Sequence, residues 1–191
     1  KELARDIALI EIEPNPHQPR TVFAAEGLNE LRDSIAQHGV LQPVVLRKTP
    51  SGFELIAGER RCRASRMAGL TTVPAIVRED VSDEVMLELA LVENVQRRDL
   101  NALEKALGYK TMMSQLTLTQ EQVASKVGLK RATVANHLRL LDLPAKVQDA
   151  VGEGLLSMGH ARALLAADGE EEQVRLLEVI VREGLSVRAI E

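Results

Sequence analysis

Three arginines crowded behind a glycine are the residues in this sequence whose spacing most clearly suggests chemistry. The stretch AGERRCRA places Arg60, Arg61 and Arg63 directly after Gly58 and Glu59, between a strand-like apolar run and a predicted helix. A helix N-terminus favours anions through its free N–H groups and the positive end of its dipole. A polyphosphate fits such a cluster, because charge-assisted hydrogen bonds are strong. Neither GxxxxGKS nor GxxxxGKT occurs in the sequence, so the cluster is not a P-loop.

A second polar stretch offers groups that a phosphate site needs. Glu59 would repel phosphates unless a metal, a water or an arginine lies between them. The stretch ENVQRR contains Glu93 and Asn94, whose hard oxygen atoms suit Mg²⁺, and Arg97 adds a cation. The loops NPHQPRT and GVLQP are candidates for base recognition and water positioning. Spacing alone leaves open the alternative that all of these charges form surface ion pairs.

Residues 118–144 have the pattern of a helix-turn-helix. Thr119 and Gln122 predict a capping box at the start of a first helix. Gly128 supplies the turn, where a positive φ is expected, and Thr133 then leads a second helix. The predicted inner faces consist of Val123, Ala124 and Val127 on the first helix and Val134, Leu138 and Leu141 on the second. Small residues at this spacing let two helices cross closely, as in DNA-binding helix-turn-helix motifs.

The charge of this segment agrees with a nucleic-acid interface. From Thr119 to Arg139 it carries Lys126, Lys130, Arg131 and Arg139 against Glu121, a local net charge of +3 in a chain of net charge −4. The side chains expected to reach phosphates or base edges are Lys130, Arg131, Thr133, Asn136 and His137. The alternative is a helical hairpin that only packs against its neighbours.

Composition excludes several other classes of protein. An acidic chain with a pI of about 5.7 binds nucleic acid only through a local basic patch. Its aromatic residues are limited to Phe23, Phe53 and Tyr109, which disfavours single-stranded nucleic acid and RNA, because both usually stack on aromatic rings. Cys62 is alone, so an intramolecular disulfide is impossible and a reducing cytoplasm is expected. No apolar run is long enough to cross a bilayer, so no membrane partner is expected.

The elements that must position these residues predict an α+β chain: a small mixed α/β nucleotide-binding domain followed by an all-α helix-turn-helix DNA-binding domain. Strand-like runs cover residues 7–12, 42–48, 53–57 and 73–77, and a helix is predicted over 28–39. Helices follow after Ser82, with breaks expected at 117–119, Gly128, Pro144, Gly159 and Gly169. The expected domains are 1–80 for nucleotide binding, 81–115 for connecting helices that complete the nucleotide site and gate, and 116–191 for DNA binding, with the helix-turn-helix at 119–141. The chain is expected to be a piece of a longer protein.

An ordered series of motifs resembles the ParB chromosome-partitioning family. NPHQPR, HGVLQPVV, GERRCRA, ENVQRRDLN, LTQEQVA, ANHLRLLDLP and LSMGHARALL occur in the family's order along nearly the whole chain. The resemblance implies a sulfiredoxin-like CTP-binding domain and a helical domain that reads the centromere-like double-stranded DNA site parS. It further implies a clamp that closes by self-association of N-terminal domains with CTP and Mg²⁺, slides on DNA and slowly hydrolyses CTP.

The same resemblance implies where such a protein works and what it lacks here. A nucleoid-associated protein of the cytoplasm is expected, with a ParA-type ATPase as partner through a segment outside this chain. The family's N-terminal tail and C-terminal dimerisation domain are also expected to lie outside it.

The resemblance assigns roles to individual residues. The nucleotide-binding set is Arg20, Thr21, Phe23, Gln42, Gly58, Glu59, Arg60, Arg61, Arg63, Glu93, Asn94 and Arg97. Glu93 and Asn94 are the expected Mg²⁺ ligands, and Gln18 and Glu59 are the candidates for water positioning or hydrolysis. The DNA-binding set is Lys130, Arg131, Thr133, Asn136, His137, Arg139, Gly159, His160 and Arg162.

Some positions depart from the family's usual residues. Cys62 occupies a commonly aromatic position, and Ala102 replaces a usual proline, so the following helix is expected to begin differently. Nucleoid-occlusion relatives usually carry Gln at the position of Arg131 and Arg at that of Gly159, so the resemblance favours the partitioning type for this chain.

Three alternative functions stay open. One is a ligand-responsive helix-turn-helix transcription regulator without hydrolysis, and another is a nucleoid-occlusion-type DNA binder. The third is a sulfiredoxin-like phosphotransferase with Cys62 as nucleophile, although a lone cysteine behind two arginines is more often a small packing residue.

Overall fold

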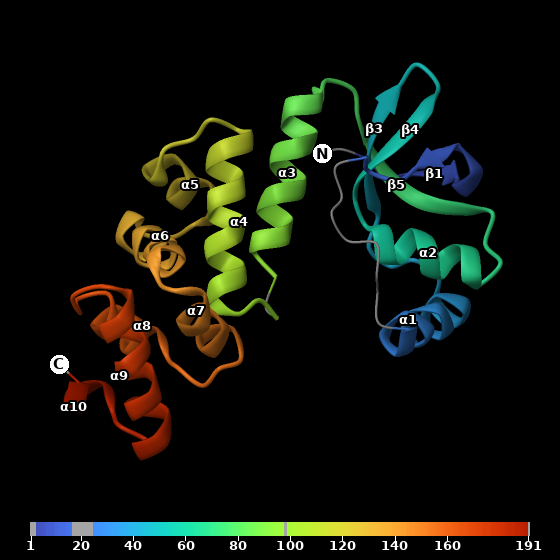
Figure 1. Ribbon diagram of the computed structural model, residues 1–191. Helices are drawn as coiled ribbons and strands as arrows, with labels where there is room; N and C mark the ends of the chain where they lie inside the picture. Colours follow the sequence, from blue (N-terminus) through green and yellow to red (C-terminus); the bar gives the residue numbers. More distant parts are fainter. Residues whose placement is uncertain (1–2, 17–24, 98, 191) are drawn as a thin grey trace. The chain divides into compact units, whose positions relative to one another are not determined.

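The computed structural model describes residues 3–16, 25–97 and 99–190, and the chain divides into two compact units, 1–90 and 91–191 (Figure 1). The division falls within helix α3 (Asp83–Val95). The first unit contains β1 (Arg5–Ala8), the 3₁₀ turn η1 (Leu9–Glu11), β2 (Ile12–Glu13), α1 (Ala25–His38), β3 (Val44–Thr49), β4 (Gly52–Ala57), α2 (Glu59–Met67) and β5 (Thr72–Arg78). No helix in the described part of the chain is long and apolar enough to cross a membrane.

The strands of the described residues form one mixed five-stranded sheet in the order β1-β5-β3-β4-β2. β1 pairs antiparallel with β5, β3 pairs parallel with β5 and antiparallel with β4, and β2 pairs parallel with β4. β1 and β2 are therefore at opposite ends of the order, yet only the three residues of η1 join them. Because a short linker cannot span a flat sheet with strands about 4.8 Å apart, the sheet curls into a half-barrel.

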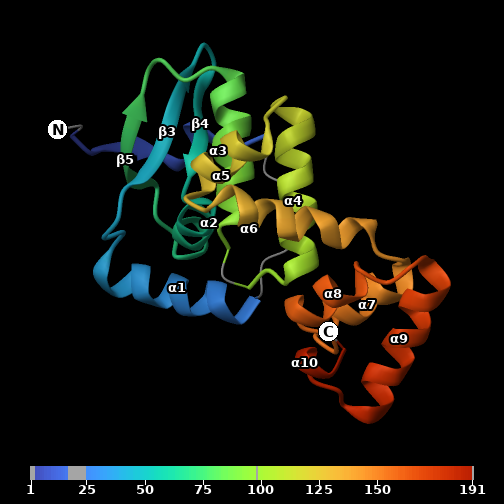
Figure 2. The ribbon, with the colours of Figure 1, turned by 90° about the vertical axis from the view of Figure 1, so that its left-hand side faces the viewer.

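The core of the first unit lies between this sheet and α2. Val44 and Leu46 alternate with more exposed neighbours along β3, as expected for a strand with one buried face. Cys62 of α2 packs into the same apolar cluster, together with Leu55 and Val73. Both ribbon views show α2 lying between the sheet and α1 (Figure 2). The packing of Cys62 in this cluster holds α2 against the sheet.

Arg47 connects the sheet to the start of α3. Its Nε donates to Glu54 on β4 at 2.7 Å, and its Nη2 donates to Asp83 in the first turn of α3 at 2.6 Å. A third N–H group reaches the carbonyl oxygen of Val81 at 3.2 Å. The half-buried guanidinium thus fixes the start of α3 relative to β3 and β4.

The second unit is helical. Its elements are α4 (Ala102–Gln115), α5 (Gln120–Val127), α6 (Arg131–Leu138), the 3₁₀ turn η2 (Arg139–Asp142), α7 (Ala145–Gly152), α8 (Met158–Leu164), α9 (Glu170–Glu183) and α10 (Val187–Ile190). The buried side chains of Ala106, Tyr109 and Met112 line the inner face of α4, against which α5, α6 and α7 pack. A second apolar cluster, which includes Leu140, Leu164 and Leu177, joins η2 to α7, α8 and α9.

Several sequence predictions are confirmed by these elements. Strands β3 and β4 form where residues 42–48 and 53–57 predict them, and α1 matches the helix expected over 28–39 to within three residues at its start and one at its end. The capping box of Thr119 and Gln122 also forms. Helix α4 begins at Ala102, because Asn101 caps it with Glu104 in a second capping box and no proline is needed.

Other predictions are wrong in their limits. The strand expected over residues 7–12 is interrupted by η1, because the chain turns there between the two ends of the curled sheet. Helix α6 begins at Arg131 rather than Thr133, and the 3₁₀ turn η2 buries Leu140 in place of Leu141. Gly159 does not break a helix but lies in the first turn of α8.

Candidate anion site and nucleic-acid interface

Gly58 begins the arginine cluster and allows it to approach the sheet. It is the N-cap of α2 with a φ of 115°, in the region that favours glycine. A Cβ atom at this position would lie 2.8 Å from Cγ1 of Val44. Glycine is therefore required both by the backbone conformation and by the contact with β3.

Arg60 extends from α2 to α1. Its Nη2 donates to the carbonyl oxygen of Gly27 at 2.7 Å, and a Cβ atom on Gly27 would lie only 2.9 Å from the same nitrogen. Gly27 thus makes room for the guanidinium. A guanidinium has five N–H donors, and this contact uses one of them.

Arg61 extends in another direction, to the loop before β3. Its Nη1 donates to the carbonyl oxygens of Gln42 and Pro43 at 2.8 and 2.6 Å. The predicted nucleotide contact Gln42 is therefore held at its backbone by a member of the cluster, while its side chain is exposed.

Arg63 pairs with Glu59 one helical turn away. Its Nε donates to Oε1 at 2.6 Å, and the side chain of Glu59 is only 11% exposed against 39% for Arg63. The carboxylate that would oppose a phosphate is thus neutralised within α2. Three arginines against one carboxylate leave a net charge of +2 at the N-terminus of this helix, which suits an anion.

The other predicted nucleotide residues are not brought to this cluster within one unit. Gln18, Arg20, Thr21 and Phe23 lie outside the described residues. Glu93 and Asn94 lie in the last turn of α3, and Arg97 follows that turn; all three belong to the second unit. Arg97 binds the carboxylate of Asp99 through Nε and Nη2, and this hydrogen bonding raises the pKa of the guanidinium.

Cys62 lies on the core side of α2. Its side chain is 1% exposed, and burial raises the pKa of the thiol to about 11. A nucleophilic cysteine needs a thiolate and access to substrate, so this environment disfavours the phosphotransferase alternative.

The helix-turn-helix consists of α5 and α6. The side chain of Thr119 accepts a hydrogen bond from the backbone N–H of Gln122, and Gly128 ends α5 with a φ of 72°. Val123, Val127 and Val134 are buried between the helices. Lys130 and Arg131 are exposed at the start of α6, whose first turn carries no acidic residue. This helix N-terminus is accessible and cationic.

The remaining predicted DNA contacts of this motif lie in different environments. Thr133 and Asn136 are half-buried on α6, and Arg139 is exposed in η2, just after the helix. His137 is directed at the protein: its ring meets that of Tyr109 edge-on, with the centroids 5.5 Å apart, and its Nδ1 lies 2.8 Å from the carbonyl oxygen of Thr133. His137 therefore connects α6 to α4.

The second predicted DNA-facing stretch forms the start of α8. A Cβ atom on Gly159 would lie 2.8 Å from Cγ2 of Val187, so this glycine lets α10 approach. The backbone N–H of Ser157 donates to Nδ1 of His160 at 3.2 Å, which leaves Nε2–H to donate to the carbonyl oxygen of Leu185 at 3.0 Å. Arg162, in contrast, is exposed.

Sequence reasoning missed Ser157 and Gly27, which help to build these sites, and Arg47, which links the sheet to α3. Ser157 and His160 form a capping box at the start of α8. A serine three positions before a polar side chain is a sequence signal for such a box. Gly27 and Arg47 carried no such signal, because their partners Arg60, Glu54 and Asp83 are distant in sequence.

Comparison with known proteins gives matches to both units. A family model described as the ParB N-terminal domain matches residues 1–95, and one described as the ParB HTH domain matches residues 98–191. Stage 0 sporulation protein J of Bacillus subtilis is 48% identical over 191 residues, which are 100% of this chain and 67% of that protein. The chromosome-partitioning protein ParB of Myxococcus xanthus is 55% identical over 174 residues, which are 91% of this chain and 58% of that protein.

A solved structure is similar along nearly the whole chain. It is the C-terminally truncated chromosome-partitioning protein ParB from Caulobacter crescentus, complexed to the centromeric parS site. It is 44% identical, with a TM-score of 0.84, and the match covers 98% of this chain and 96% of that chain.

Proposed function

Because this chain belongs to the ParB family, we propose that it is a CTP-dependent DNA clamp that acts in chromosome segregation. It recognises parS through its helical unit and binds CTP and Mg²⁺ through its N-terminal unit. It then closes by self-association of the N-terminal domains, spreads along DNA and slowly hydrolyses CTP to CDP and phosphate. The observation that carries this proposal is the presence, in one chain, of a cationic helix-turn-helix and an arginine cluster at a helix N-terminus.

Contacts and charges of α6 support the DNA half of the proposal. Arg131 is the first residue of α6, exposed beside Lys130, with no acidic side chain in that turn. An arginine at the start of a recognition helix can read the edge of a guanine in the major groove or bind a backbone phosphate beside it. The similar Caulobacter protein was crystallised with parS, which supports the same kind of site for this chain. Asn136, Arg139 and Arg162 are proposed as further DNA contacts, while His137 and His160 act through their protein partners.

The geometry of α2 supports the CTP half. Gly58, Arg60, Arg61 and Arg63 surround a helix N-terminus with a net charge of +2 after Glu59 is counted. The bonds to Gly27 and to the loop before β3 fix the arginines in advance, which lowers the entropic cost of binding a triphosphate. We propose Gln42 as a nucleotide neighbour and Glu59 as a residue of the hydrolysis step. The selection of cytosine rests on the family resemblance.

Glu93 and Asn94 fit a role toward Mg²⁺. Mg²⁺ is usually held by one or two side-chain oxygens together with phosphates and water, and the described residues contain no cluster of three or more His, Cys, Asp or Glu side chains that could hold a metal alone. Bound there, Mg²⁺ would neutralise charge on the phosphates. Arg97 is proposed to assist from the same segment.

We propose the same domain limits that the sequence indicates. Residues 1–80 bind CTP, residues 81–115 connect and gate, and residues 116–191 bind DNA, with the helix-turn-helix at 119–141. A nucleoid location and a ParA-type ATPase partner, reached through a segment outside this chain, follow from the family resemblance.

The environment of Gly159 favours the partitioning type over a nucleoid-occlusion-type DNA binder. A Cβ atom at this position already meets Val187 at 2.8 Å. The arginine usual in nucleoid-occlusion relatives would therefore displace α10 from α8. Arg131 supports the same assignment, because the occlusion type usually carries glutamine there.

A nucleotide hydrolysis assay with Mg²⁺ tests the proposal. CTP, ATP, GTP and UTP are each incubated with parS duplex, with scrambled duplex or without DNA. Turnover of CTP alone, stimulated by parS alone, is the expected result. Absence of both CTP turnover and CTP binding would reject the clamp and leave a plain DNA-binding module. Sedimentation with and without CTP tests closure, and a dimer formed equally without ligand would contradict CTP-dependent association.

A further inference from the structure

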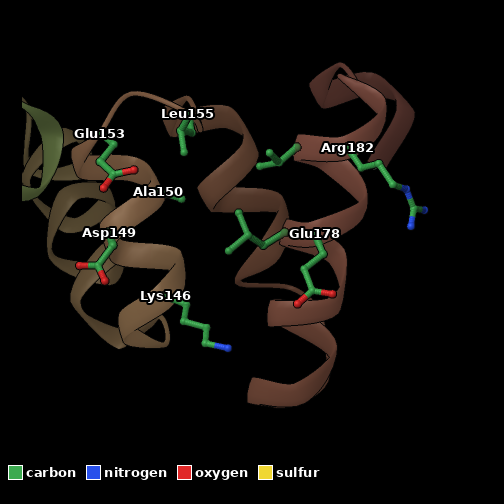
Figure 3. Close-up of a pocket in the computed structure, with 9 residues that line it drawn as sticks. Lys146, Asp149, Ala150, Glu153, Leu155, Glu178 and Arg182 are labelled. Carbon is green, nitrogen blue, oxygen red and sulfur yellow. The ribbon is translucent and has the colours of Figure 1, made fainter.

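A groove on the helical unit has no part in the proposed function. It lies between α7 and α9 and has a volume of about 420 Å³. Ala150 and Leu177 form a buried floor, while Leu155 and Val181 form aliphatic walls that are 57% and 49% exposed (Figure 3). Exposed apolar surface rimmed by charged side chains is typical of a protein interaction site.

The rim of this groove is acidic. It carries the carboxylates of Asp149 and Glu153 from the α7 side and that of Glu178 from α9, against the single ammonium group of Lys146. Within the described residues, none of these four forms an ion pair or side-chain hydrogen bond, so the rim has a net charge of −2. The negative end of the α7 dipole, beside Glu153, adds to this field.

The second cation near the groove does not change this balance. Nη2 of Arg182 pairs with Glu183 at 2.9 Å, and Figure 3 shows the Arg182 side chain directed away from the floor. Its charge is therefore offset on α9 itself. The free charge that a partner meets is that of the carboxylates.

We propose that the groove between α7 and α9 docks a cationic amphipathic helix of a partner protein. Leucine-like side chains at positions i and i+3 or i+4 would pack between Leu155 and Val181, as in other helix-in-groove complexes. Lysine or arginine side chains flanking them would lie against Asp149, Glu153 and Glu178. This attraction between opposite charges would speed association. DNA is a polyanion and is repelled by this rim. The proposal is independent of CTP and parS binding.

Two labelled peptides of about four helical turns test the proposal. Both carry the same leucine positions, and the polar positions are lysine in one peptide and glutamate in the other. Fluorescence anisotropy with the intact chain at low ionic strength is expected to show binding of the lysine peptide, and binding of the glutamate peptide weaker by about tenfold or more.

Variants of the chain locate the binding to this groove. Val181→Glu is expected to lower the affinity for the lysine peptide by about tenfold or more. The matched control is Leu107→Glu on α4, where Leu107 is similarly exposed at 50%; this variant should bind the peptide as the wild type does. Glu178→Lys leaves the apolar floor intact and should also lower the affinity for the lysine peptide. It therefore tests the proposal even if Val181→Glu folds poorly. Binding of parS duplex reports the fold of each variant. Equal binding of both peptides, wild-type affinity in folded Val181→Glu or Glu178→Lys, or no binding of the lysine peptide would overturn the proposal.

Discussion

Arg63 donates to Glu59 at 2.6 Å across one turn of α2. This ion pair explains why a carboxylate can stand among arginines that are proposed to hold a triphosphate. Glu59 restrains Arg63 and removes one unit of positive charge, so Arg60 and Arg61 carry the remaining net charge. The partner that the sequence required for Glu59 is therefore an arginine of the same cluster.

Glu59→Gln is expected to separate CTP binding from hydrolysis. Removing the negative charge raises the net charge of the cluster from +2 to +3, so CTP affinity should equal or exceed that of the wild type. Turnover should fall by about tenfold or more, because an acid–base group typically contributes at least that much. Titration calorimetry and phosphate release measure the two effects, and Glu30→Gln on α1 is the control. Loss of CTP binding would instead show that the ion pair builds the site.

Arg60→Ala is expected to weaken CTP binding strongly and leave parS binding intact. One charge-assisted hydrogen bond to a phosphate is worth about 1.5–3 kcal/mol, or about 10–150-fold in affinity. Arg32→Ala is a matched control, because among the residues that the structure describes Arg32 pairs with its neighbour Asp33 alone. Unchanged CTP affinity in a titration of Arg60→Ala would refute the assignment of the cluster.

Arg131→Ala is expected to remove the preference for parS over scrambled duplex. A side chain that reads a base contributes about 1–3 kcal/mol of discrimination. CTP binding should be unaffected, because Arg131 lies in the helical unit. Electrophoretic mobility shifts at fixed salt measure the ratio of the affinities for parS and scrambled duplex. Arg175→Ala on the exposed face of α9 is the control. If both duplexes bind as before, α6 does not read the site.

Gly159→Ala is expected to destabilise the helical unit. The added methyl group would lie 2.8 Å from Val187, and overpacking of this kind costs about 1–3 kcal/mol. Gly152→Ala is the matched control, because its added methyl group would lie 3.9 Å from Leu103, at ordinary contact distance. Urea unfolding measures the free energy of unfolding of both variants and of the wild type. The double variant Gly159→Ala with Val187→Ala should regain stability; if it does not, the contact is not the cause.

The stability of the N-terminal unit is expected to fall at high pH because of Cys62. Burial raises the pKa of its thiol from 9.0 to about 11, so above pH 9 the unfolded chain loses this proton before the folded chain does. Stability contributed by the protonated thiol is therefore complete below pH 9 and is lost as the pH rises toward 11. The loss is on the order of 2 kcal/mol.

Unfolding of the wild type and of Cys62→Ala between neutral pH and pH 11 measures this loss. The variant should lack the slope that is specific to the thiol. Cys62 should also resist alkylation at neutral pH in the folded chain. Rapid alkylation there, or loss of CTP turnover in Cys62→Ser alone, would revive a nucleophilic role for this cysteine.

Local sequence signals predicted much of the helical unit. The capping box of Thr119 and Gln122 and the turn at Gly128 are determined by neighbours along the chain, so both are found where the sequence places them. The start of α6 was missed by two residues, because Lys130 caps it without a side-chain hydrogen bond. The inward contact of His137 with Tyr109 depends on the packing of α6 on α4. The hydrophobic period of α6 alone does not predict that packing.

The arginine cluster shows the same limit. Its position at a helix start was predicted from GERRCRA, and α2 begins at Glu59. The partners of Arg60 and Arg61 were not predicted, because Gly27 and Pro43 lie 33 and 18 residues away and are brought near only by the sheet and its helices. Pairings between distant segments require the tertiary fold, and single-residue patterns do not encode them.

The curled sheet has a consequence for how the protein folds during synthesis. Ile7 pairs with Val73, and Ile12 pairs with Phe53, so the first strands to be made wait for partners that are made much later. The loop-closure entropy of these pairings must be overcome before the N-terminal unit gains its core. The contacts of α5 with α6, in contrast, are local and form quickly. Newly made N-terminal strands are therefore exposed for longer than any helix of the second unit, and this interval is where misassembly and chaperone binding are expected.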